Sequence, residues 1–274
     1  MNESFSRKLF MRDLKLPFCP GCGNYVIIDT FLRAVYELGY RNLKNFVFCS
    51  GIGCAAWIPS PYFLADSIHT PHGRSIPVAV GIKLVKPELK VVVFGGDGDL
   101  AGIGLSHLIH AARRNADVTV FMVNNQVYGM TGGQVAPTTL QGIKTTSTPY
   151  GSFESPLDTS KIVAEAGASY VARWTTAHRN ELKESMKRAI LTEGFSFVEI
   201  LSQCPTMFGR HAGFKNLVEI IKWFKEKSVS VEESRKLSEE ELSDRIVIGE
   251  FVRRKLVPLT KIFSSLREKA LEAV

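Results

Sequence analysis

Cysteine is scarce in this chain of 274 residues, and long hydrophobic runs are missing from it. Five cysteines are too few for the disulfide scaffold of a secreted protein, and a chain of this length needs none. No apolar run reaches the ~18 residues of a membrane span. The N-terminal stretch mixes charged with apolar side chains, unlike a signal peptide. We therefore expect a cytoplasmic protein that does not act in a membrane.

Basic residues moderately outnumber acidic ones, which gives a formal net charge of +7. Lysine and arginine are spread along the chain and do not cluster with aromatic residues, so no nucleic-acid partner is expected. A hydrophobic content of 45% with 22% charged residues is ordinary for a globular protein. An anionic cofactor or an acidic electron carrier would suit the positive charge.

The stretch from 91 to 134 is typical of a βαβ unit. A short apolar strand ends at the glycine-aspartate turn of residues 95–99, and a helical pattern follows it. A second strand is expected over 118–123 and ends at a pair of asparagines. Parallel strands in such a unit release their loops at the same, carboxyl edge of the sheet. Asp97 and Asn125 are therefore predicted to lie close together.

These loops supply hard oxygen ligands for a divalent cation. The Asp97 carboxylate, the Asn125 amide and the Val127 backbone carbonyl suit Mg²⁺. The glycines let the backbone approach a diphosphate closely, and a helix N-terminus stabilises the anion further. A nicotinamide site fits worse, because it needs G-x-G-x-x-G at the first turn. The GDG turn, with two asparagines ending 28 residues after Asp97, resembles the fingerprint of thiamine diphosphate sites.

Cysteines outside the strands form a second candidate site. Cys49 lies within an apolar strand and is expected to be a buried small hydrophobe. The first pair precedes a helix expected to start at Asn24, a position that favours thiolates. Four thiolates suit a [4Fe–4S] cluster, and Cys-Pro recurs at the last ligand of ferredoxin motifs. Zinc and unligated thiols remain alternatives, since structural zinc usually takes two close pairs. The candidate thiols are Cys19, Cys22, Cys54 and Cys204.

Alternating strand and helix patterns predict an α/β fold. Strands are expected at 46–49, 91–94, 118–123, 169–172 and 195–201. Helices are expected at 24–38, 77–84, 160–167, 180–192, 215–227 and 260–273, besides the one that follows the glycine-aspartate turn. Residues 55–75 are expected to be mostly loop, and the polar stretch 131–155 a lid or docking segment. A capping box is predicted at 238–241. The last helix is amphipathic, and packing on its own domain and docking on another subunit are both open.

Together these motifs resemble the β subunit of the 2-oxoacid:ferredoxin oxidoreductases, most closely the 2-oxoglutarate type (2-oxoglutarate synthase). The similarity covers most of the chain, including FCPGCGN at 18–24, SGIGC at 50–54, HGR at 72–74, NNQVYGMTGGQVAPTT at 124–139 and GFSFVEILSQCPTMFGR at 194–210. The resemblance implies the thiamine diphosphate-binding fold: a mostly parallel sheet with helices on both faces and a helical C-terminal extension. Residues 1–205 would hold the cofactors, and residues 206–274 would pack on that domain or on a partner subunit.

The resemblance also implies an activity and its site residues. The reaction is the oxidative decarboxylation of a 2-oxoacid with coenzyme A, which yields an acyl-CoA, carbon dioxide and reduced ferredoxin. Cluster ligands would be the four candidate thiols, and Mg²⁺ ligands would be Asp97, Asn125 and Val127. The residues expected to line thiamine diphosphate are Ile52, Gly53, Cys54, Ala55, His72, Gly98, Asp99, Gly129 and Met130.

No catalytic residue is assigned to this chain. Thiamine enzymes need a glutamate to activate the aminopyrimidine, and in the family that the chain resembles this glutamate belongs to the α subunit. An α subunit, with γ and δ subunits as further candidates, is therefore an expected partner, and the chain alone is expected to be inactive. Arg74 and Lys83 could hold a substrate carboxylate or simply be solvated. Ala55 and Pro71 depart from the serine and threonine common in relatives, which leaves secondary cofactor contacts open.

Several alternatives remain open at this point. The substrate could be 2-oxoglutarate, which we prefer, or pyruvate or a branched-chain 2-oxoacid. A non-oxidative thiamine diphosphate decarboxylase with structural zinc is a second possibility, although Cys204 followed by Pro205 is unfavourable to it. A non-catalytic electron-carrier or interaction subunit is a third, and the Asp97 and Asn125 pair weighs against it because a carrier needs no Mg²⁺.

Overall fold

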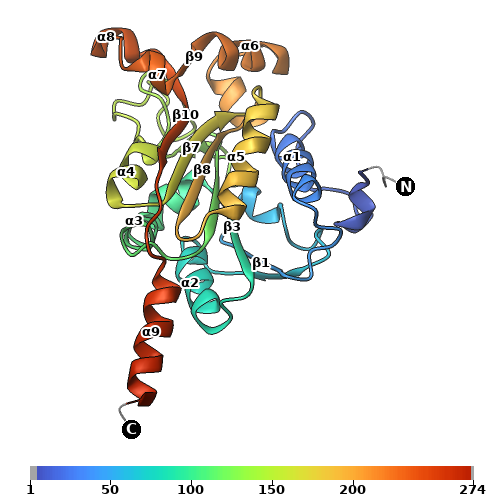
Figure 1. The fold of residues 1–274 in the computed structure, drawn as a ribbon. Coiled ribbons are helices and arrows are strands. Elements are labelled where there is room, and N and C mark those ends of the chain that lie inside the picture. The colour runs from blue at the N-terminus through green and yellow to red at the C-terminus, as the bar shows by residue number, and fades with distance from the viewer. Residues whose placement is uncertain (1–4, 273–274) are drawn as a thin grey trace.

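The computed structural model describes residues 5–272. Residues 1–4 of the charged N-terminal stretch, and Ala273 of the last expected helix, lie outside these. One sheet of eight strands, in the order β2-β1-β3-β4-β8-β7-β10-β9, runs through the molecule with helices on its two faces (Figure 1). The strands are β1 (Phe46–Ser50), β2 (Asp66–His69), β3 (Lys90–Gly96), β4 (Thr119–Asn124), β7 (Tyr170–Thr175), β8 (Ser196–Leu201), β9 (Ser228–Ser230) and β10 (Ile246–Arg253).

Helices cover the sheet from both sides. One face carries α1 (Asn24–Glu37) and α5 (Arg179–Leu191), and the other carries α2 (Ser75–Val85), α3 (Leu105–Arg113) and α4 (Thr159–Ala166). Near the C-terminus follow α6 (Leu217–Lys227), α7 (Val231–Ser234), α8 (Glu239–Leu242) and α9 (Leu259–Glu272). Both capping-box hydrogen bonds expected for Ser238 and Glu241 are present at the start of α8. None of the helices within residues 5–272 is both long and apolar enough to cross a membrane.

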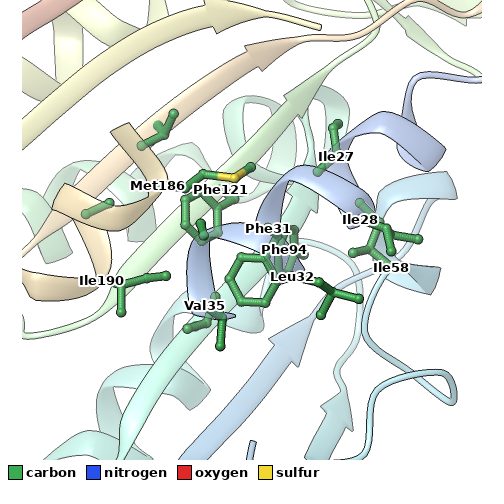
Figure 2. Close-up of a cluster of buried hydrophobic side chains, with 14 of the residues drawn as sticks. Ile27, Ile28, Phe31, Leu32, Val35, Ile58, Phe94, Phe121, Met186 and Ile190 are labelled. Atoms are coloured by element: carbon green, nitrogen blue, oxygen red, sulfur yellow. The ribbon is translucent and has the colours of Figure 1, made fainter. Parts of the chain in front are cut away.

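The core explains why the central strands are continuously apolar. Successive side chains of a strand point to opposite faces, and here both faces are covered. Phe94 and Phe121 point toward α1 and α5, where Phe31 packs edge-on against them at 5.3 and 5.7 Å between ring centroids (Figure 2). Val93 and Cys49 point toward the helices on the other face. Removing one such buried phenylalanine typically costs about 3–5 kcal/mol.

The predicted parallel arrangement is confirmed. β1, β3, β4, β8 and β7 pair in parallel, so the loops that follow them leave at one edge of the sheet. Cys49 is fully buried in β1, as expected. The α/β fold with helices on both faces is therefore the observed one.

The structure differs from the sequence-based expectation at both margins of the sheet. β2 lies within the expected loop 55–75, and all its residues are exposed, so no hydrophobic pattern marks it. β10 pairs antiparallel with β7 and parallel with β9, so the extension from residue 206 is not wholly helical and contributes strands to the sheet. α9 projects away from the body (Figure 1), and Ile262, Phe263 and Leu266 on it are exposed. Most of the apolar face of α9 is thus exposed, while Leu259 at its start packs against the core.

Candidate functional site

A cavity of about 310 Å³ lies at the carboxyl edge of the sheet. Its walls come from the loops that follow β1, β2, β3, β4 and β8, and from the segment before α1. Parallel strands deliver these loops to one place, which is where α/β proteins commonly bind ligands. The volume lies at the lower end of the roughly 300–1,000 Å³ found for small-molecule sites.

All the residues expected to bind the cofactor, the cluster or Mg²⁺ border this one cavity, whereas the two candidate substrate ligands, Arg74 and Lys83, do not. Lys83 is buried, donates hydrogen bonds to the carbonyls of Pro87 and Leu89 at 2.8 Å, and pairs with Asp117 at 3.0 Å. It is therefore neither solvated nor a substrate ligand. The residues that border the cavity as expected are Cys19, Cys22, Ile52, Gly53, Cys54, Ala55, His72, Asp97, Gly98, Asp99, Asn125, Val127, Gly129, Met130 and Cys204.

Asp97 places a buried carboxylate at the end of β3. Its side chain accepts a hydrogen bond from the Thr138 hydroxyl and is only 2% exposed. Burial raises the pKa of Asp97 to about 6, although Thr138 and nearby backbone amides, among them that of Asn125, act in the opposite direction. A divalent cation next to such a carboxylate would favour its ionised form. The chemistry of this position fits a Mg²⁺ ligand.

The turn after β4 holds the two other expected Mg²⁺ ligands. The Asn125 side-chain oxygen accepts from the Val127 amide at 3.2 Å, and Gln126 adopts a left-handed conformation with φ of 65°. The Asn124 side-chain oxygen accepts from the Gln126 amide at 3.1 Å. The Thr139 hydroxyl donates to the Gln126 carbonyl at 2.6 Å. The turn is therefore tightly held, and its Asn125 amide touches the Asp97 carboxylate.

Asp99 connects two loops above the cavity. One of its carboxylate oxygens accepts from the Ile52 amide at 3.2 Å and the Gly73 amide at 2.7 Å, and lies 2.6 Å from His72 Nδ1. Gly51 packs against the same carboxylate, and a Cβ there would lie 2.2 Å from its other oxygen. Asp99 therefore orients His72 and holds the loop after β1 in place, in addition to bordering the cavity.

Gly98 lets an aromatic ring close one wall. A Cβ at Gly98 would lie 2.3 Å from the Tyr128 ring, and the Tyr128 hydroxyl donates to the Gly98 carbonyl at 3.2 Å. The Tyr128 ring therefore occupies the space beside the Gly98 Cα, and the absence of a side chain at Gly98 makes room for the ring.

Other residues at the cavity were not expected from the sequence. Tyr128 could have been found, because it stands inside the NNQVYG motif between two expected residues. The others carry no chemical signal of their own and enter the cavity wall only through the fold. The unexpected residues include Asn24, Trp57, Tyr128, Gln203 and Met207.

The four candidate thiols share the cavity. Cys54 Sγ and Cys204 Sγ lie 3.8 and 3.9 Å from the position that a Cβ on Gly129 would take, so both sulfurs lie beside this glycine. Burial, together with the neighbouring thiols Cys204, Cys54 and Cys19, raises the pKa of Cys22 to about 12. The Asn24 amide at the start of α1 acts in the expected direction and lowers the pKa of Cys22, but burial outweighs it in the chain by itself.

The thiols also differ from a site for one ion. Burial and the charges of Cys204 and Cys19 raise the pKa of Cys54 to about 11. Across residues 5–272, no three His, Cys, Asp or Glu side chains are arranged to hold a single metal ion. In a [4Fe–4S] cluster the four cysteines bind one cofactor of several irons, so they need not converge on one point.

Comparisons with known proteins agree on one family. Residues 51–200 match the model of the thiamine pyrophosphate enzyme, C-terminal TPP binding domain. The 2-oxoglutarate synthase subunit KorB of Methanocaldococcus jannaschii is 49% identical, over 89% of this chain and 90% of that protein. The 2-oxoacid:ferredoxin oxidoreductase subunit beta of Saccharolobus solfataricus is 44% identical, over 69% of this chain and 62% of that protein. The chain is also similar to a solved structure, the 2-oxoglutarate:ferredoxin oxidoreductase from Magnetococcus marinus with 2-oxoglutarate, coenzyme A and succinyl-CoA bound. The TM-score is 0.85 and the sequence identity 32%, and the match covers 98% of this chain and 91% of that chain.

Proposed function

This chain belongs to the β subunits of the 2-oxoacid:ferredoxin oxidoreductases, and on that premise we propose that it carries the thiamine diphosphate site and a [4Fe–4S] cluster of such an enzyme. The reaction is the oxidation of a 2-oxoacid with coenzyme A to an acyl-CoA and carbon dioxide, with the released electron pair passed to ferredoxin. The observation that carries the proposal is that Asp97, Asn125 and the four thiols border one cavity.

The proposed cofactor site uses groups that the fold already orients. Asp97, Asn125 and the Val127 carbonyl would hold Mg²⁺, and Gly98, which borders the cavity beside Asp97, would contact the diphosphate. Asp99 would keep His72 turned toward the same cavity, since it binds the ring at Nδ1. The chemistry that thiamine diphosphate supplies when bound is attack of a carbanion on the keto carbon of the substrate.

The proposed cluster lies next to this site. The position that a Cβ on Gly129 would take lies 3.3 Å from Asn125 Nδ2. The Cys54 and Cys204 sulfurs lie beside the same glycine. Electrons leaving the substrate would therefore have a short path to the cluster. Zinc in a non-oxidative decarboxylase is the alternative, and the similarity to ferredoxin-dependent oxidoreductases disfavours it.

2-Oxoglutarate is the proposed substrate. Relatives at 46–49% identity are 2-oxoglutarate synthase subunits, and the similar solved structure contains 2-oxoglutarate. Pyruvate and branched-chain 2-oxoacids are the competing substrates. The partners are an α subunit, which completes the site, and a ferredoxin.

The test is coenzyme A-dependent reduction of a viologen dye by the anaerobically purified complex of this chain with its α subunit. The complex is offered 2-oxoglutarate, pyruvate and 2-oxoisovalerate in turn. We expect rapid reduction with 2-oxoglutarate and much slower reduction with the others. Faster reduction with another of these acids would mean that the proposed substrate is wrong and the proposed reaction is right. No reduction with any of the three, by a complex that contains iron and thiamine diphosphate, would contradict the reaction.

A further inference from the structure

Glu199 places a charge inside the sheet, where every other residue of β8 is uncharged. It is 1% exposed in a strand that is buried along its whole length. Burying a carboxylate is costly unless it is paired and hydrogen-bonded. Here Arg173 Nε donates to it at 2.8 Å, the Ser160 hydroxyl at 2.6 Å and the Asn124 amide at 2.7 Å. The carboxylate is therefore fully engaged, and it does not border the cavity.

Asn124 connects this carboxylate to the turn that carries the proposed Mg²⁺ ligands. Its side-chain nitrogen donates to one Glu199 oxygen, while its side-chain oxygen accepts from the Gln126 amide. Both ends of the Asn124 amide are thus used, and its orientation is determined. β4 and β8 are neighbours in the sheet, with Asn124 opposite Leu201, so the contact joins adjacent strands at the cavity edge.

We infer that Asn124 and Glu199 are a positioning pair for the cation site, an inference that rests on the proposed function. Neither residue borders the cavity, so the pair acts through the Asn125 side chain and the Val127 carbonyl. Gln126 between them is left-handed, a conformation that a non-glycine residue holds only when the surroundings enforce it. The hydrogen bond from its amide to Asn124 supplies part of that constraint.

Arg173 supplies the positive charge that the buried carboxylate needs. Its guanidinium forms ion pairs with Glu199 and Asp158, and the residue is 8% exposed. Residues that orient metal ligands from behind typically change metal affinity about 10- to 100-fold when they are altered. A role limited to stabilising the sheet would instead lower the unfolding temperature and leave the Mg²⁺ requirement unchanged.

The test measures Mg²⁺ binding without using turnover. The complex with the α subunit is stripped of metal and titrated with Mg²⁺ at fixed thiamine diphosphate, with the near-ultraviolet circular dichroism of the cofactor as the signal. We expect Asn124→Ala to raise the half-saturating Mg²⁺ concentration about 10- to 100-fold. Excess Mg²⁺ should restore full cofactor binding, and iron content should stay unchanged.

Ser160→Ala is the matched control. It removes a hydrogen bond to the other oxygen of the same carboxylate and does not touch Asn124. We expect its Mg²⁺ midpoint to equal that of the unaltered complex. Equal shifts in Ser160→Ala and Asn124→Ala would overturn the inference, because they would indicate general loosening around Glu199.

Two further variants keep the inference falsifiable. Glu199→Gln preserves the size of the side chain and serves as the test if Asn124→Ala fails to fold. We expect it to raise the half-saturating Mg²⁺ concentration as well. Asp97→Ala should abolish Mg²⁺-dependent binding. Asn124→Ala and Glu199→Gln could leave the half-saturating Mg²⁺ concentration unchanged while Asp97→Ala abolishes binding. The positioning role would then be wrong, and the proposed cation site would stand. If Asp97→Ala also changes nothing, the proposed cation site is wrong and the inference fails with it.

Discussion

Gly98 is a residue whose identity is set by a neighbour rather than by its own backbone. The Tyr128 ring occupies the space that a side chain at Gly98 would need. Tyr128 in turn donates a hydrogen bond to the Gly98 carbonyl. The two residues come from loops 30 positions apart in the chain, which meet only because β3 and β4 are parallel.

Gly98→Ala should therefore displace Tyr128 and weaken thiamine diphosphate binding at least tenfold, a loss of about 1.4 kcal/mol. Isothermal titration of the metal-loaded complex with the cofactor measures this. Gly81→Ala is the matched control, because a Cβ at Gly81 in α2 meets nothing within 4 Å. That change should leave binding intact and stabilise the helix by about 0.5–1 kcal/mol. Unchanged affinity in Gly98→Ala would mean that the Tyr128 ring has no role at the cofactor.

Cys204→Ser tests the cluster separately from the cofactor. Serine removes one proposed ligand, so we expect iron content to fall and the visible absorption of the cluster to be lost or altered. Thiamine diphosphate should still bind, because Asp97 and Asn125 are unchanged. Cys49→Ala is the control, since Cys49 is buried in β1 away from the cavity. Normal iron content in Cys204→Ser would place the fourth ligand elsewhere.

Residues in short motifs at strand ends could be predicted, and residues joined by distant contacts could not. Asp97 and Asn125 were identifiable because each directly follows an apolar strand. Thr138, which donates to Asp97, lies in the long segment 131–155, whose path no periodicity determines. Lys83 was misjudged for the same reason, since its partner Asp117 comes from another part of the chain.

Among the elements, strands buried on both faces were readable and those at the margins were not. β3 and β4 are continuous apolar runs because helices cover both their sides. β2 is exposed along its length, so its sequence DSIH has no pattern. β10 carries apolar residues, but its place beside β7 depends on antiparallel pairing over a long separation. Local sequence does not encode such a pairing.

α4 begins at an aspartate with two roles. Asp158 accepts from the Lys161 amide at the start of the helix, and it forms an ion pair with the buried Arg173. Burial by itself would raise the pKa of Asp158, but Arg173 and the helix amide hold it below its usual range. Because the pKa is lower in the folded state, this carboxylate contributes stability above its unfolded pKa. That contribution is lost as pH falls through the folded pKa.

Asp158→Asn should expose this contribution. Asparagine keeps the helix cap, so the change removes only the ion pair with Arg173. We expect the free energy of unfolding to fall by about 1–3 kcal/mol near neutral pH. The difference in the free energy of unfolding between the two proteins should shrink below about pH 4. Urea unfolding across a pH series measures this difference. Asp13→Asn, at an exposed aspartate, is the control. A difference independent of pH would mean that the Arg173 charge does not stabilise Asp158.

At the scale of the whole molecule, the cavity is incomplete in its chemistry. Of the residues that line it, only Asp97 and Asp99 carry carboxylates, and this statement concerns residues 5–272. Asp97 accepts from Thr138 and is assigned to Mg²⁺, and Asp99 is engaged by His72 and two backbone amides. The other Asp99 oxygen has no hydrogen-bond partner, but it is buried against Gly51, so we expect neither carboxylate to activate the aminopyrimidine of the cofactor. We therefore expect the activating glutamate to come from the α subunit.

The chain by itself should therefore bind thiamine diphosphate without activating it. We expect slow exchange of the cofactor C2 proton with deuterium, measured by quenched-flow NMR, and no viologen reduction by the purified chain. Addition of the α subunit should accelerate the exchange at least a hundredfold, which corresponds to a barrier about 2.7 kcal/mol lower. The Asp99→Asn variant in the complex is the control: slower exchange there, with the α subunit present, would mean that Asp99 also takes part. Rapid exchange in the chain alone would show that its own carboxylates suffice.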